Sequence, residues 1–235
     1  MSDIMRMTTK RQVFLTVLLL ATSTVIPVFA QAATVINGQS CEQNLACDMQ
    51  KTDLARAATA SASSTLENSP EYAPANAIDA APDVAPGEYW GNSTTAWCEG
   101  AAGVGVGQTI RLDFAAPQPL ALLNISPGYE KSLDLYTKNS RLREAHLTLS
   151  DGSEYRLVFG KHFYDASSLK QSWKPMDVPY LEMNSPQVFE ISPEGQPPKV
   201  IDWMEIRILK ADMGSKYSDT CISRIEIAPQ WDMGF

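Results

Sequence analysis

Short segments that alternate apolar and polar residues, separated by turn-forming residues, constrain the fold of this chain most strongly. A period of two is typical of β-strands with one buried face, and no long stretch after residue 58 keeps a helical period. Asp151-Gly152 lies between two such segments and predicts a hairpin. The sequence therefore predicts an all-β fold, a jelly-roll β-sandwich. The predicted strands are residues 109–114, 120–125, 144–150, 154–159, 187–191, 200–209 and 222–227.

The first 30 residues have the pattern of an export signal. Basic residues at positions 6, 10 and 11 precede an apolar run at residues 13–20, and Val28 and Ala30 supply the small residues before a cleavage site. An uncleaved membrane anchor is the alternative. Polar residues and Pro27 interrupt the apolar run, which makes it short for a span of about 20 apolar residues. We therefore predict cleavage after Ala30, with Ala32 or Ala33 as alternatives, and a secreted or periplasmic protein.

Cleavage would leave one domain-sized chain with 16 basic and 26 acidic residues, a net charge of about −10. Such a charge disfavours nucleic acids and anionic lipids, and neutral ligands such as sugars, or cations, remain open. No later segment is apolar enough to span a membrane. The predicted parts are a signal peptide (1–30), an N-terminal extension with a small disulfide loop (31–57), the sandwich domain (58–229) and a C-terminal tail (230–235).

All four cysteines follow the predicted cleavage site. An even number in an exported chain indicates two disulfides, for which three pairings are possible. We favour Cys41–Cys47, which closes a small loop, together with Cys98–Cys221, which links distant segments. A zinc site is the alternative, but the sequence has no CxxC spacing and no histidine near a cysteine.

Motifs for catalysis are weak. The glycine-rich stretch at residues 100–107 lacks the GK[ST] ending of a phosphate loop and precedes a strand, so we predict a tight turn there. His146 and His162 have no serine elbow that would nominate a nucleophile. Nothing in the sequence singles out a carboxylate pair for glycoside hydrolysis. We therefore predict a protein that is not an enzyme, with a small hydrolase as a minor alternative.

Metal ligation is a limited possibility. Acidic residues could supply oxygen ligands to Ca²⁺, although they lack the spacing of an EF-hand. We predict no cofactor and leave a calcium site as an option. The acidic residues in question are Asp79, Asp83, Glu88 and Glu99.

Aromatic and polar residues gather in the predicted loops. Sugar rings present an apolar face, which aromatic side chains match, and a rim of hydroxyls, which amide and charged side chains match. Trp97 could instead be a core residue, and Arg141 could instead pair with an acid of the same domain. The ligand-binding candidates are Trp90, Trp97, Glu99, Tyr129, Lys131, Asn139, Arg141 and Asp219.

The same loops carry a family resemblance. Residues 60–64 (ASASS), 72–79 (YAPANAID) and 95–100 (TAWCEG) resemble the opening of a discoidin-like domain of the F5/8 type C class. Residues 103–110, 128–132, 136–141 and 218–223 are similar to the NADase-type glycan-binding domain, a module also found as the translocation domain of streptococcal NAD glycohydrolase. The match covers about residues 58–229.

The resemblance implies a galactose-binding-like sandwich that binds glycan or cell-surface carbohydrate through loops at one end. It does not imply NADase activity. A protein-interaction or export-helper role is the alternative. Three departures stand out: an insertion extends to residue 93, Arg224 replaces an acid, and Cys98 and Cys221 replace small or apolar residues. Because the two cysteine motifs should be neighbours in this fold, their paired departure supports one mutual disulfide.

Overall fold

The computed structural model describes residues 32–40, 53–79, 94–160 and 187–230, and the statements below concern these ranges. The larger of two sheets contains, in spatial order, β1 (Thr34–Asn37), β8 (Glu154–Val158), β7 (Ser140–Leu149), β10 (Lys199–Asp212), β5 (Thr109–Leu120) and β3 (Ala58–Ala62). At one end, β11 (Thr220–Ile222) pairs with β7, and β4 (Trp97–Cys98) pairs with β11. The smaller sheet contains β12 (Arg224–Ala228), β6 (Leu122–Ser126), β9 (Gln187–Glu190) and β2 (Gln39–Ser40).

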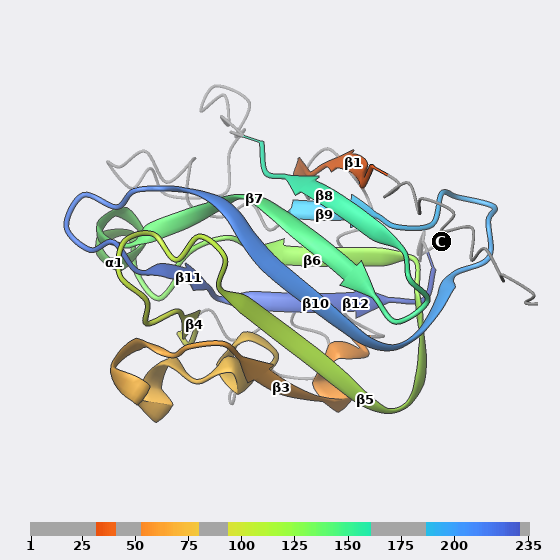
Figure 1. The fold of residues 1–235 in the computed structure, drawn as a ribbon, viewed down its shortest axis with the longest axis horizontal. Helices are drawn as coiled ribbons and strands as arrows, with labels where there is room; N and C mark the ends of the chain where they lie inside the picture. The colour runs from red at the N-terminus through yellow and green to blue at the C-terminus, as the bar shows by residue number, and fades with distance from the viewer. Residues whose placement is uncertain (1–31, 41–52, 80–93, 161–186, 231–235) are drawn as a thin grey trace, which may run out of the picture. The chain divides into compact units, whose positions relative to one another are not determined.

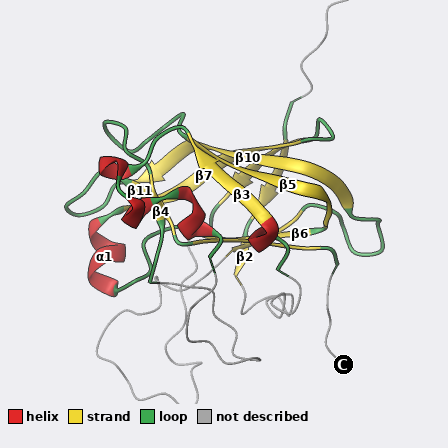
Figure 2. Ribbon diagram, turned by 90° about the horizontal axis from the view of Figure 1, so that it is seen from below, coloured by secondary structure: helices red, strands yellow, loops and turns green. Residues whose placement is uncertain are grey.

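The two sheets lie as layers over a shared core, as Figure 2 shows. Alternation decides which side chains face that core. In β10, Met204, Ile206 and Ile208 are buried, whereas Glu205 and Arg207 point outward and form an ion pair of 3.2 Å. The predicted all-β, discoidin-like sandwich is therefore confirmed.

Short helices connect the strands. Figure 1 shows most of them at one end of the sandwich, whereas the turn that precedes β3 lies at the other end of that strand. Each is too brief to form a layer of its own, so the β-sheets supply the core. They are four 3₁₀ turns, η2 (Ala55–Ala57), η3 (Leu66–Asn68), η4 (Pro70–Tyr72) and η5 (Pro74–Ala77), and one helix, α1 (Leu133–Lys138).

The smaller sheet is buried on both faces, which explains the unusual Arg224. Every residue of β6 and β12 is buried. The face turned away from the core is polar: Asn124 Nδ2 donates to Glu226 Oε2 at 2.6 Å, and Arg224 Nη1 lies 3.4 Å from Glu226 Oε1. The charge of Arg224 also acts on the buried carboxyl of Glu130. Arg224 is thus the positive member of an internal polar cluster.

All seven predicted strands exist, with one division that the sequence did not reveal. The segment predicted at residues 222–227 is two strands, because β11 belongs to the larger sheet and β12 to the smaller one. The change of sheet occurs at Ser223, whose backbone N–H donates to Ser126 O at 3.1 Å. Ile225 and Ile227 follow Ile222 closely as core residues, so the segment was predicted as one strand.

The predicted extension at residues 31–57 contributes to both sheets. Within it, β1 pairs in parallel with β8, and β2 pairs with β9. Asp53 then binds the smaller sheet, because its Oδ1 accepts the N–H of Ile227 at 3.2 Å. Cys41 and Cys47 lie outside the described residues, so the predicted loop between them stays a prediction.

Two predicted turns are confirmed. Asp151-Gly152 connects β7 to β8, where Gly152 has a φ of +84° and Asp151 Oδ1 accepts the N–H of Ser153 at 2.9 Å. The glycine-rich stretch before β5 is a turn in which Gly103, Gly105 and Gly107 have φ values of +83°, +65° and +91°. Only glycine adopts such values without strain.

Substitution of Gly105 by alanine is expected to lower the free energy of unfolding by about 2 kcal/mol or more. A Cβ at this position would overlap the buried carboxyl of Glu99, in addition to the strain from the positive φ. Urea denaturation measures the loss. Gly103→Ala is the matched control, because its φ is also positive but no atom lies within 4 Å of the new Cβ. Equal losses in the two variants would contradict the packing argument.

Candidate functional site

The candidate site lies at the end of the sandwich where β4, β11 and α1 meet (Figure 1). A disulfide between Cys98 and Cys221 joins the two short strands, whose Cα atoms lie 4.1 Å apart at these residues. Cys221 is also in register with Arg141 at the start of β7. The predicted pairing of Cys98 with Cys221 is therefore confirmed, and it holds three loop-bearing strands together.

An aromatic pair packs against this disulfide. The rings of Tyr72 and Tyr129 meet edge to face, with centroids 6.4 Å apart and an interplanar angle of 85°. Tyr129 is only 4% exposed, and it lies with Cys98 and Cys221 in one buried cluster. Tyr72 is half-buried and packs against that cluster from outside. Tyr72, rather than the predicted Tyr129, therefore carries the accessible aromatic surface.

The local sequence fixes the position of Tyr72. Pro70 occupies the first turn of η4, and Ser69 Oγ accepts the N–H of Glu71 at 3.2 Å, which is a typical helix start. Asn76 Nδ2 then donates to the carbonyl of Glu71 at 2.7 Å. These bonds hold the turn that carries Tyr72 on a defined path.

Asp219 supplies a carboxylate next to this ring. Its backbone carbonyl accepts the N–H of Ser140 at 3.0 Å, so the loop before β11 is fixed to β7. Within the described part of the chain, its carboxylate makes no hydrogen bond. The pKa of Tyr72 is raised by burial first and then by the negative charges nearby, including Glu71, Glu67 and Asp219. The accessible tyrosine thus lies in a locally negative environment.

Glu99 is inside the protein rather than in the accessible site. Its Oε2 accepts the N–H of Ala101 at 2.7 Å, and its Oε1 accepts the N–H of Thr220 at 3.1 Å. Burial raises its pKa, and these two hydrogen bonds oppose that rise. With no exposure and both oxygens engaged, Glu99 anchors the loop between β4 and β5 to the residue before Cys221.

Three other predicted site residues have structural contacts. Trp97 is fully buried and its Nε1 donates to Ser64 O at 3.0 Å, as the alternative core interpretation expected. Asn139 is buried at the end of α1, where its Nδ2 donates to Leu135 O at 2.8 Å. The guanidinium of Arg141 lies 5.1 Å from the ring centroid of Tyr136, so half-buried Arg141 is held near the site by a cation–π contact.

Lys131 is exposed at the N-terminal side of α1 and has no ion pair with any described residue. Trp90 lies outside the described residues, and so do Asp83 and Glu88. Asp79 accepts the hydroxyl of Thr95 at 2.9 Å. Within the described ranges, no three histidine, cysteine or acidic residues gather as a metal site, and no helix has the length and apolarity to cross a membrane.

The site therefore unites part of the predicted set. The loops bring Tyr129, Lys131, Arg141 and Asp219 to the same end of the sandwich. Tyr129 is buried there and packs against the more accessible ring of Tyr72. Sequence reasoning missed Tyr72 and Glu71. Tyr72 does open the stretch YAPANAID, so its place in that motif was a usable signal, whereas its exposure depends on contacts from distant loops.

The sequence comparison is decisive for the family. Residues 50–228 match the family described as the NAD glycohydrolase translocation F5/8 type C domain. The chain belongs to this family. The resemblance predicted from the loop motifs is thereby confirmed. The family is described as a translocation domain, which fits a module rather than a catalytic domain. No curated protein matches the chain.

Solved structures share the fold of this F5/8 type C domain. The CBM32-1 and CBM32-2 domains of Clostridium perfringens ZmpB, in complex with GalNAc, give a TM-score of 0.50 at 9% identity, over 85% of this chain and 40% of that chain. The family 32 CBM of C. perfringens NanJ, in complex with galactose, gives 0.45 at 15% identity, over 75% and 97%. Mycobacterial arabinofuranosyltransferase AftD gives 0.46 at 18% identity, over 76% and 11%, so this chain spans about a tenth of that enzyme. The ZmpB likeness supports the fold alone.

Proposed function

We propose that this F5/8 type C domain binds neutral glycans outside the cytoplasm, through the loops at the disulfide-linked end of the sandwich. The observation that carries the proposal is the half-buried Tyr72, held edge to face against Tyr129 beside the carboxylate of Asp219. A fixed aromatic face next to polar groups suits the apolar face and hydroxyl rim of a sugar. The ZmpB domains, whose structure is in complex with GalNAc, add support by analogy of fold.

The negative charge near Tyr72 favours uncharged glycans over anionic ones. Glu67, Glu71 and Asp219 all act on the ring of Tyr72. Like charges repel, so sugars that carry carboxylates, sulfates or phosphates are disfavoured there. The guanidinium of Arg141 lies over the ring of Tyr136, 5.1 Å from its centroid. Uncharged hexoses and N-acetylhexosamines are the expected ligands.

The disulfide supports an extracytoplasmic location. Disulfides persist in oxidising compartments, and the Cys98–Cys221 bond is buried within the site that we propose. Cleavage after Ala30 belongs to the same proposal. Mass spectrometry of protein purified from periplasm and medium tests both, because it would identify a mature N-terminus at residue 31.

Tyr72→Ala is expected to weaken glycan binding at least tenfold, because the ring supplies the accessible stacking face. Isothermal titration with galactose and N-acetylgalactosamine measures the effect. Tyr217→Ala is the matched control: Tyr217 is 38% exposed on the loop before β11, and its ring contacts Lys216. Tyr217→Ala should retain wild-type affinity. Equal affinity in wild type and Tyr72→Ala, with wild-type stability, would remove the ring from the site.

A protein-interaction role in export is the second candidate, favoured by the word translocation in the family description. It predicts that the same loops contact another exported protein. A panel of neutral glycans that leaves the folded domain unaffected would favour this role over glycan binding.

A further inference from the structure

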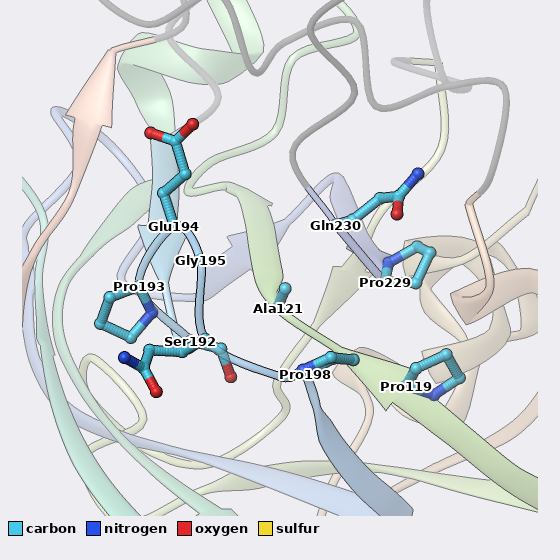
Figure 3. Close-up of a pocket in the computed structure, with 10 residues that line it drawn as sticks. Pro119, Ala121, Ser192, Pro193, Glu194, Gly195, Pro198, Pro229 and Gln230 are labelled. Atoms are coloured by element: carbon cyan, nitrogen blue, oxygen red, sulfur yellow. The ribbon is translucent and has the colours of Figure 1, made fainter.

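A hollow lies at the other end of the sandwich, and Figure 3 shows the residues that line it. The turn between β5 and β6, the loop between β9 and β10, and the residues after β12 border an open hollow of about 450 Å³. Ligand pockets in proteins fall in the range of roughly 300–1,000 Å³. The candidate site described above lies at the end with β4, β11 and α1, so the hollow is separate from it (Figure 1).

The frame of this hollow is fixed by backbone hydrogen bonds that meet at Ala121. The carbonyl of Ala121 accepts the N–H groups of Ile191 and Ser192 at 2.8 and 3.0 Å, and its own N–H donates to Ala228 O at 2.8 Å. Figure 3 shows Ala121 between Glu194 on one side and Gln230 on the other. Three segments that are distant in sequence thus converge on one residue, so the hollow is preformed.

Polar groups in the lining lack partners. Ser192 is only 4% exposed, and its hydroxyl has no hydrogen-bond partner among the described residues. The side-chain amides of Gln196 and Gln230, which also line the hollow, have none there either. The Ser192 hydroxyl is not one of the buried side-chain atoms that lack a partner, and Gln196 and Gln230 are exposed. All three groups are therefore open to solvent and available to a polar ligand.

The rest of the lining decides the class of ligand. Four proline rings provide apolar surface, and Glu194 is the one charged residue among the described lining. Without a basic residue, the hollow does not attract phosphate or acidic groups. With a single carboxylate, it does not offer the acid pair that glycoside hydrolysis requires. Apolar surface with free amides and a hydroxyl suits an uncharged molecule with many hydroxyls.

We infer that this hollow is a second binding site for a neutral saccharide, independent of the site around Tyr72. The domain would then hold two sugars at opposite ends of one rigid sandwich. Two weak sites on one scaffold increase the apparent affinity for a surface that displays many glycans, provided that both sites engage together. The domain would also bridge neighbouring glycan chains.

The test is a titration of the ¹⁵N-labelled chain with galactose, N-acetylgalactosamine, glucose, N-acetylglucosamine and mannose, monitored by amide chemical shifts. At least one sugar should shift amides of residues 192–196 and 230. In the double variant Gln196→Ala/Gln230→Ala, these shifts should require at least tenfold more sugar. Gln118→Ala, which removes an amide outside the lining, should not change the titration.

The outcomes separate this inference from the proposed function. Shifts around Tyr72 alone would overturn the second site and leave the proposed function standing. Shifts around the hollow that survive Tyr72→Ala and weaken in the double variant would support the second site, even if the site at Tyr72 gave none. The absence of amide shifts at residues 192–196 and 230 with all five sugars would also overturn it.

Discussion

Replacement of both Cys98 and Cys221 by serine is expected to lower the free energy of unfolding by about 2–5 kcal/mol. The disulfide closes a loop over a sequence separation of 123 residues, and chain-entropy arguments give such long loops the larger effects. Strand β4 has only two residues, and β11 is its one partner in the described sheets. The covalent bond therefore adds to the hydrogen bonds between Glu99 and Thr220 that join the same two segments.

Urea denaturation of the oxidised wild type and the double serine variant measures this effect. Cys41→Ser/Cys47→Ser is the matched control, because the predicted small loop should yield a smaller loss. Glycan affinity should fall together with stability only in the 98/221 variant, since that bond holds β4 and β11 beside Tyr72. An unchanged midpoint in the 98/221 variant would contradict the structural role of the bond.

The stability of the domain is expected to fall as the pH rises from about 5 to about 8. Burial raises the pKa of Glu130 from 4.5 to about 7, the charge of Arg224 opposes the rise, and Glu226 adds to it. Burial, with the charge of Glu226, likewise raises the pKa of Asp53 from 3.8 to about 6. A carboxyl with a raised pKa in the folded state favours folding below its unfolded pKa, and this advantage is lost as the pH passes the folded pKa.

Glu130 alone should account for roughly 3 kcal/mol of this loss. Glu130→Gln removes the ionisation and keeps the shape, so it should flatten the pH dependence and raise stability at pH 8. Glu194→Gln, at an exposed position, is the control for loss of one negative charge. Urea denaturation at pH 5 and pH 8 compares the three proteins. A Glu130→Gln variant with the wild-type pH dependence would show that this carboxyl ionises without cost.

The strands were predictable because each has one face toward the shared core, and alternation in sequence reports such a face directly. Strand β12 was harder, since Arg224 and Glu226 point away from the core and are buried nevertheless. Both residues lie on the face of the smaller sheet that is turned away from the core. An alternating sequence pattern predicts that such a face is exposed, but here it is buried. The division at Ser223 was missed because core residues continue on both sides of it, at Ile222 and at Ile225.

The site was only partly predictable because residue type does not determine exposure. Tyr129 and Tyr72 are the same kind of residue in neighbouring motifs, yet Tyr129 lies under Tyr72. Glu99 looked like a ligand contact, but the backbone N–H groups of Ala101 and Thr220 occupy its carboxylate. The Cys98–Cys221 bond was predictable because the two departures from the family pattern occurred together.

The most direct test of glycan binding at the disulfide-linked end is a map of sugar-induced amide shifts across the ¹⁵N-labelled domain. The account predicts that a neutral hexose or N-acetylhexosamine shifts Tyr72, Lys131 and Asp219, and that Tyr72→Ala abolishes these shifts while the fold persists. A folded domain in which no neutral sugar moves these three residues would contradict it.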